Sequence, residues 1–86
     1  MFLNKSPQGL NNLCGKKVAQ LRKNMQPKTS QRALAQMLQV AGLDVDKNAI
    51  QRIESGQRFV TDIELAVLAS VLQVSCDILL TDKEGL

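Results

Sequence analysis

Residues 30–56 read SQRALAQMLQVAGLDVDKNAIQRIESG, and this stretch decides how the rest of the chain is interpreted. Two short segments with the apolar spacing of a helix meet here across a turn that contains Gly42. Ser30 and Asp46 precede these segments, and both residue types cap helices by accepting a backbone N–H in the first turn. Gly42 suits the left-handed backbone position that follows a helix end. The stretch therefore predicts two helices, from residue 31 to 39 or 41 and from residue 47 to 55.

The second of these helices separates into two faces when its residues are placed about 100° apart around the axis. One side carries Ala49, Ile50 and Ile53, and the other is entirely polar. Polar side chains of these types can pair with base edges in the DNA major groove, Asn or Gln with adenine and Arg or Lys with guanine. A solvated face is the alternative, because the same residue types are ordinary on any exposed helix. The polar residues are Lys47, Asn48, Gln51, Arg52 and Ser55.

Together the two segments resemble the phage-repressor-like family of helix-turn-helix regulators, also called the Cro-type or xenobiotic-response-element (XRE) family. The similarity rests on the motif LA at residues 34–35 and the motif IxxIExG at residues 50–56, and it extends over about residues 15–80. The turn around residues 40–45 is longer than in most of the family. The resemblance implies an all-α, compact five-helix bundle that contains a helix-turn-helix, as in the DNA-binding domain of lambda repressor.

The resemblance also implies roles for individual side chains. Family members contact bases from the first, second and sixth positions of the second helix, which are Lys47, Asn48 and Arg52 here, with Gln51 as a fourth candidate. Gln31 starts the preceding helix and is implied to clamp a phosphate and to brace the second helix. The loop that follows the second helix is implied to contact the DNA backbone through Ser55, Gln57 and Arg58.

Glu54 lies at the edge of the polar side, where a carboxylate would be repelled by phosphate. It therefore needs a cation nearby. The family commonly pairs this residue with an Arg of the first helix, and Arg22 occupies the matching position. We expect Arg22 and Glu54 to form a structural ion pair, with a solvent-exposed Glu54 as the alternative.

Three further helices are predicted outside the central stretch. Apolar residues from Leu10 to Met25 recur every three or four positions and indicate a first helix that ends near Met25. Thr61 and Glu64 form a capping box for a fourth helix, which is apolar nearly all round, and Ser75 caps a last short one. The predicted organisation is a flexible N-terminal arm over residues 1–9, a helix-turn-helix DNA-binding domain over 10–80 and a polar tail over 81–86.

Composition bounds the class of protein. A chain of 86 residues, 44% hydrophobic and with only two aromatic side chains, fits one small domain with an aliphatic core. Ten Lys/Arg and three Asp/Glu lie in residues 1–60, against one and five in residues 61–86. A basic front half is expected of a module that meets phosphate with one face, although a merely solvated basic face is common.

The same composition argues against catalysis and metal binding. Cys14 and Cys76 are far apart and the chain has no histidine, so an ordinary four-ligand zinc site cannot form and structural thiols are expected. No nucleophile–base pair or glycine-rich phosphate loop stands out, and we expect no enzyme, no catalytic residues and no cofactor. The sequence has neither the ~20-residue apolar run of a membrane span nor a signal-peptide pattern, which predicts a cytoplasmic protein.

The hypothesis from the sequence is a sequence-specific DNA-binding transcriptional regulator, in its simplest form a repressor. The helix at residues 47–55 would enter the major groove of a palindromic operator, and the protein would act as a homodimer. The dimer interface is expected on the side of the fourth and fifth helices, with Phe59, Val67 or Leu79 as candidates. Two alternatives stay open: an antitoxin-type regulator that also binds a toxin, and a protein-interaction module without DNA binding.

Overall fold

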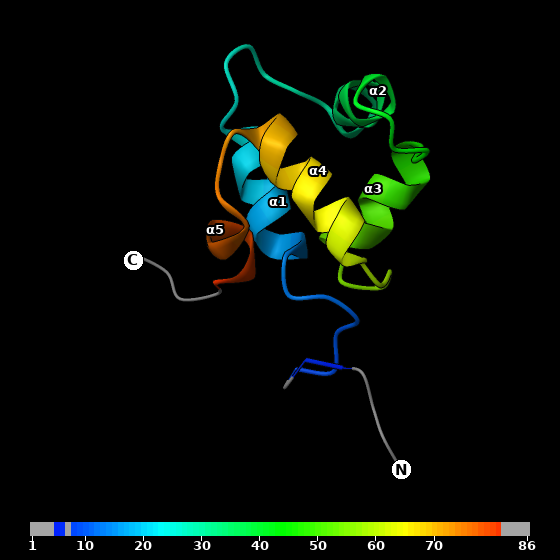
Figure 1. Ribbon diagram of the computed structural model, residues 1–86, viewed down its shortest axis with the longest axis vertical. Coiled ribbons are helices and arrows are strands. Elements are labelled where there is room, and N and C mark those ends of the chain that lie inside the picture. Colours follow the sequence, from blue (N-terminus) through cyan, green and yellow to red (C-terminus); the bar gives the residue numbers. More distant parts are fainter. Residues whose placement is uncertain (1–4, 7, 82–86) are drawn as a thin grey trace.

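The computed structural model describes residues 5, 6 and 8–81, which form five α-helices joined by loops (Figure 1). The helices are α1 (Gly15–Lys23), α2 (Gln31–Val40), α3 (Lys47–Glu54), α4 (Asp62–Leu72) and α5 (Cys76–Leu80). No strand occurs in this part of the chain, so the predicted all-α fold is confirmed. Most of the expected arm, residues 1–4 and 7, and most of the expected tail, residues 82–86, lie outside the described residues.

α4 crosses the middle of the molecule and packs against α1, α2 and α5 (Figure 1). α2 and α3 lie together on one side of it, and α5 lies on the other side, against α1. α3 also packs against α1, so it is supported by both of the helices that precede it. This arrangement leaves the outer side of α3 open to solvent.

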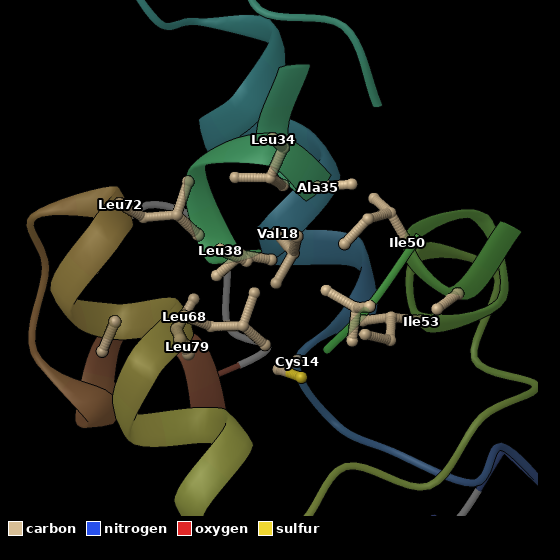
Figure 2. Close-up of a cluster of buried hydrophobic side chains, with 13 residues drawn as sticks. Cys14, Val18, Leu34, Ala35, Leu38, Ile50, Ile53, Leu68, Leu72 and Leu79 are labelled. Carbon is tan, nitrogen blue, oxygen red and sulfur yellow. The ribbon is translucent and has the colours of Figure 1, made fainter. Parts of the chain in front are cut away.

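A single aliphatic core joins all five helices, and Figure 2 shows its side chains converging from every one of them. Burying one Leu, Ile or Val side chain of this kind stabilises a fold by about 1.5–3 kcal/mol. Leu79 of α5 is 0% exposed, so its candidacy for the dimer interface is wrong. The largest fully buried side chains are Val18 of α1, Leu34 and Leu38 of α2, Ile50 and Ile53 of α3, Leu68 of α4, Leu79 of α5 and Cys14.

Local capping interactions begin four of the five helices, as the sequence predicts. Ser30 accepts the backbone N–H of the third residue of α2 at 3.0 Å, and Asp46 does the same for α3 at 2.8 Å. Thr61 and Glu64 form the complete capping box of α4, with hydrogen bonds in both directions. Ser75 caps α5. Each such cap contributes roughly 0.5–2 kcal/mol, and these helix starts are set by residues at most three positions away.

The predicted first helix, from Leu10 to Met25, is wrong at its start because α1 begins only at Gly15. The preceding segment is held against the loop after α3 instead, where the backbone N–H of Asn11 donates to the carbonyl of Gly56 at 2.8 Å. In a helix from Leu10 the carbonyl of Leu10 would accept the N–H of Cys14, whereas here it accepts the backbone N–H of Ser6 at 2.7 Å. The apolar residues of this segment thus have separate roles without a helix: Leu10 contacts the loop at Gly56, and Cys14 joins the buried core.

Candidate nucleic-acid interface

α3 presents a polar face to solvent. The side chains of Lys47, Asn48, Gln51 and Arg52 are all exposed on it. Within the part of the chain that the structure describes, none of these four side chains makes a hydrogen bond or an ion pair. The opposite face is buried in the core. The four predicted base-contacting residues thus share one open surface, with their donors and acceptors uncommitted.

The start of α3 is held by the turn that connects it to α2. Gly42 adopts a φ of 99°, the left-handed conformation predicted for the residue after a helix end. Gln39 then donates from Nε2 to the carbonyl of Val45 at 2.7 Å and closes the long turn over itself. Val45 is only 3% exposed and fills the space beneath. The extended turn is therefore a packed connection that joins α2 to the start of α3.

The end of α3 is held by Glu54, which binds side chains of α1 and α2 together. Arg22 of α1 donates from Nε to Oε2 at 2.6 Å and from Nη2 to Oε1 at 3.0 Å. Gln31 of α2 donates from Nε2 to the same Oε1 at 2.9 Å. A third Arg22 hydrogen bond, from Nη1 to the carbonyl of Thr29 at 3.0 Å, reaches the loop before α2. One carboxylate thus joins three helices at the edge of the open surface.

The Arg22–Glu54 pair is largely shielded from water, with side chains 11% and 8% exposed. The hydrogen bonds to Glu54 raise the pKa of Arg22 above its ordinary value, because they favour the charged guanidinium. The ion pair expected from the sequence is therefore present, and the alternative of a solvent-exposed Glu54 is wrong. Neutralised in this way, Glu54 carries no free negative charge towards an approaching phosphate.

Gln31 supplies the brace that the resemblance implies, through its hydrogen bond to Glu54. Its amide has a second N–H, so a phosphate contact stays a prediction. Beside it, the start of α2 borders a hollow of about 270 Å³ that includes Lys23 and Lys28 in its wall. Neither lysine is predicted as a DNA contact from the sequence, although Lys23 ends α1 and Lys28 lies two residues before the N-cap of α2.

The loop after α3 carries the remaining predicted phosphate contacts. Ser55 and Gln57 are exposed, and Ser55 donates from Oγ to the carbonyl of Arg52 at 3.2 Å. Arg58 is engaged elsewhere, since its Nη2 donates to Oε2 of Glu64 at 2.8 Å. Its Nε–H is buried and meets no acceptor among the described residues. Arg58 is therefore tied to the start of α4, and its predicted phosphate contact competes with that ion pair.

Asn12 is the residue of this region that sequence reasoning missed. Its Nδ2 donates to the carbonyl of Ile53 at 3.1 Å and to that of Arg58 at 2.7 Å. Its Oδ1 accepts the backbone N–H of Gly15 at 2.8 Å. An Asn shortly before a helix is a recognisable local signal for the bond to the N–H of Gly15. The first two join residues more than forty positions apart, and no local pattern indicates them.

The remaining predictions from the sequence concern the two cysteines, metal binding and membrane spans. Cys14 and Cys76 are free thiols, and burial raises the pKa of Cys14 to about 11. No group of three or more potential metal-ligating side chains occurs among residues 5, 6 and 8–81. None of the helices described there is long and apolar enough to cross a membrane.

Comparison with protein families agrees with this geometry. The helix-turn-helix family model HTH_3 matches residues 18–79. The chain belongs to the HTH_3 helix-turn-helix family. This is the XRE-type family of Cro and lambda repressor, and membership supports a DNA-binding helix-turn-helix regulator. The match begins inside α1, so the segment of Asn12 lies outside it. Searches of curated proteins and of solved structures find no match.

Proposed function

We propose that this helix-turn-helix protein is a sequence-specific transcriptional repressor in the cytoplasm, without enzymatic activity. The observation that carries the proposal is the open polar face of α3, whose side chains are uncommitted while both ends of the helix are anchored. The Arg22–Glu54 pair and the hydrogen bond from Gln31 hold the end of α3, so that its polar face is presented in one orientation. Repression follows most simply from occupying an operator that overlaps a promoter.

In this proposal α3 lies in the major groove and reads base edges. Asn48 and Gln51 have amides that can donate to and accept from adenine, and Lys47 and Arg52 can donate to guanine N7 and O6. Each good bidentate contact is worth about 1–3 kcal/mol of discrimination against a wrong base. The four side chains span the exposed length of α3, which suits a readout of several consecutive base pairs.

The surroundings of α3 would hold the phosphate backbone and orient the helix. Gln31 at the start of α2 and the loop residues Ser55, Gln57 and Arg58 are the proposed contacts. Lys23 and Lys28, which line a hollow with the N-cap residue Ser30, add positive charge before the start of α2. Contacts of this kind position a protein on the duplex and make its binding depend on salt, but they carry no sequence information.

A two-fold homodimer would place two α3 helices in half-sites about 34 Å apart on a palindromic operator. Exposed apolar side chains on the α4–α5 side support an interface there. Ile63 is 70% exposed, and Ile78 and Leu80 of α5 are each 43% exposed. Phe59, at 55% exposed, lies in the loop before α4 and remains a candidate. Covering such side chains with a second copy would remove apolar surface from water.

Selection of bound sequences from random duplex DNA tests the proposal most directly, followed by titration of the winning sequence at several salt concentrations. We expect an enriched palindrome and an affinity that falls steeply as salt rises. An enriched single half-site would contradict the dimer. No enrichment at all would contradict sequence-specific binding and favour a protein partner, such as a toxin, as the target of this domain.

A further inference from the structure

The segment before α1 is bound along the loop that follows α3. Leu10 covers Gly56 so closely that a Cβ at Gly56 would lie 2.8 Å from a Leu10 methyl carbon. The Asn11 backbone N–H donates to the carbonyl of Gly56 at 2.8 Å, and its side chain donates to that of Gln57 at 2.8 Å. Asn12 adds its two bonds to Ile53 and Arg58. Residues 10–12 and 56–58 thus form one hydrogen-bonded unit.

Asn12 is the centre of this unit because it alone reaches α1, α3 and the loop with one side chain. The three bonds use its whole amide, two N–H groups and the oxygen. The helices also approach closely at this point, since a Cβ on Gly15 would lie 2.0 Å from the carbonyl oxygen of Ile53. The end of α3 is therefore pressed against the start of α1 and held there by Asn12.

We infer that Asn12 is a positioning residue for DNA recognition: it sets the direction of α3 and the placement of the loop at residues 55–58 against the DNA. The inference rests on the proposed function. α3 is anchored at its start by the α2–α3 turn and at Glu54 by Arg22 and Gln31. Asn12 provides a further anchor through the carbonyls of Ile53 and Arg58. It joins the end of α3 to the loop, which the Arg58–Glu64 ion pair also holds to α4.

Loss of the Asn12 hydrogen bonds should displace the end of α3 and the loop that follows it. α3 has eight residues and is about 12 Å long, and Asn12 binds only its last turn and the following loop, so losing Asn12 should shift that end more than the start. Gln51 and Arg52, near that end, would lose register with base edges. The neighbouring loop would lose register with phosphate. Because residue 12 lies outside the family match at residues 18–79, this anchor is a feature of the chain beyond the matched family region.

Two substitutions of Asn12 and one control test the inference in the full chain. Asn12→Ala removes all three hydrogen bonds. Asn12→Ser keeps an oxygen that can accept from Gly15 but is too short to bridge to the carbonyls of Ile53 and Arg58. Ser75→Ala is the control for lost stability, because it removes the cap of α5, which packs against α1 and α4. All variants are compared on a duplex with a single half-site of the selected operator, so that the dimer interface proposed on the α4–α5 side does not enter. Affinity for this half-site and for an unrelated duplex is measured well below the melting temperature of each variant.

For both Asn12 variants we expect half-site affinity to fall about tenfold, which corresponds to about 1.4 kcal/mol. Binding to the unrelated duplex should fall less, and preference should relax at the bases that Gln51 and Arg52 read. Exchange of the Gln57 amide hydrogen, which is bonded to the carbonyl of Arg52 at 2.9 Å, should accelerate in the free variants. Ser75→Ala should lower the melting temperature and leave the half-site-to-unrelated ratio unchanged.

The outcomes separate this inference from the proposed function. If wild-type protein selects no duplex, sequence-specific recognition is refuted, and a role of Asn12 in it falls with it. If wild-type protein selects an operator and Asn12→Ala keeps the same ratio, the positioning role is wrong while the proposed function stands. Restoration of the wild-type ratio by Asn12→Ser would also overturn it, because the bond to Gly15 would then suffice.

Discussion

Replacing Arg22 by Met tests whether the end of α3 is held by a buried ion pair. The change removes the two hydrogen bonds to Glu54 and the one to the carbonyl of Thr29. Glu54 keeps only the hydrogen bond from Gln31 and is left 8% exposed without a counter-charge. Met preserves most of the apolar stem of Arg22, so the lost packing is small and the effect reports mainly on charge and hydrogen bonding.

The expected loss of unfolding free energy is about 3 kcal/mol. Removing one partner of a buried ion pair typically costs 3–5 kcal/mol, because the other charge stays buried without compensation. The lower end applies here, since both side chains retain some exposure, 11% and 8%, and Gln31 still solvates Glu54. For a domain of this size, about 3 kcal/mol lowers the melting temperature by roughly 12–24 °C.

Urea denaturation followed by circular dichroism measures the effect, and a double-mutant cycle isolates the pair. Arg22→Met and Glu54→Met are compared singly and together. The double variant should lose about 2 kcal/mol less unfolding free energy than the sum of the two single losses. Lys23→Met is the matched control, because it likewise replaces a cation by Met, at the exposed neighbour of Arg22 in α1. Its unfolding free energy should stay within about 0.5 kcal/mol of wild type.

A loss below about 1 kcal/mol for Arg22→Met would refute the reasoning, because that is the range of an exposed surface pair. Additive single losses in the cycle would refute it as well. Either result would mean that Glu54 can turn to solvent, and that the Arg22–Glu54 pair does not anchor the end of α3.

Three further predictions follow from other parts of the molecule. In a competition titration, Arg52→Ala should cost about 1–3 kcal/mol of binding free energy on the selected operator and relax the preference at one base position. Arg58→Ala should instead weaken binding to all sequences alike. Equal loss of base preference in both variants would contradict the assignment of Arg52 to a base and Arg58 to phosphate. Gly15→Ala should lower the unfolding free energy by about 1–3 kcal/mol in urea, because the new Cβ would lie 2.0 Å from the Ile53 carbonyl oxygen; a gain, as at an open helical site, would show that the close approach is absent. The pKa of Cys14 is about 11 in the fold against 9.0 ordinarily, so the thiolate forms more readily in the unfolded chain. The contribution of Cys14 to the unfolding free energy should therefore be constant below pH 9 and fall as the pH rises towards 11. Cys14→Ala should remove this contribution to the pH dependence.

Much of the fold could be predicted because its signals are local. Ser30, Asp46, Thr61 and Ser75 each bond to a backbone group three residues ahead, so the sequence alone contains both partners. Gly42 is recognisable for the same reason, since a left-handed conformation depends mainly on the residue itself. The split of α3 into an apolar and a polar side is likewise a property of helical spacing.

The candidate site was predictable only in part. Its exposed residues on α3 follow from the helical wheel, but the pairing of Arg22 with Glu54 came from the family resemblance and not from spacing. The partner of Arg58 was not predicted, because Glu64 approaches it only once the loop has folded onto α4. The apolar pattern of the last helix makes Leu79 an interface candidate, yet the packing of α5 against α1 and α4 buries it completely.

The sequence by itself determined which segments are helical from Ser30 onwards, where those helices begin and which face of α3 is polar. Only the tertiary structure decided that residues 10–12 leave the helical pattern, bind the loop after α3 and fix its end through Asn12. The physical reason is the distance along the chain between interacting groups. A cap or a helical face depends on neighbours within about one turn, whereas Nδ2 of Asn12 bonds to carbonyls more than forty positions away, which only the folded chain brings near.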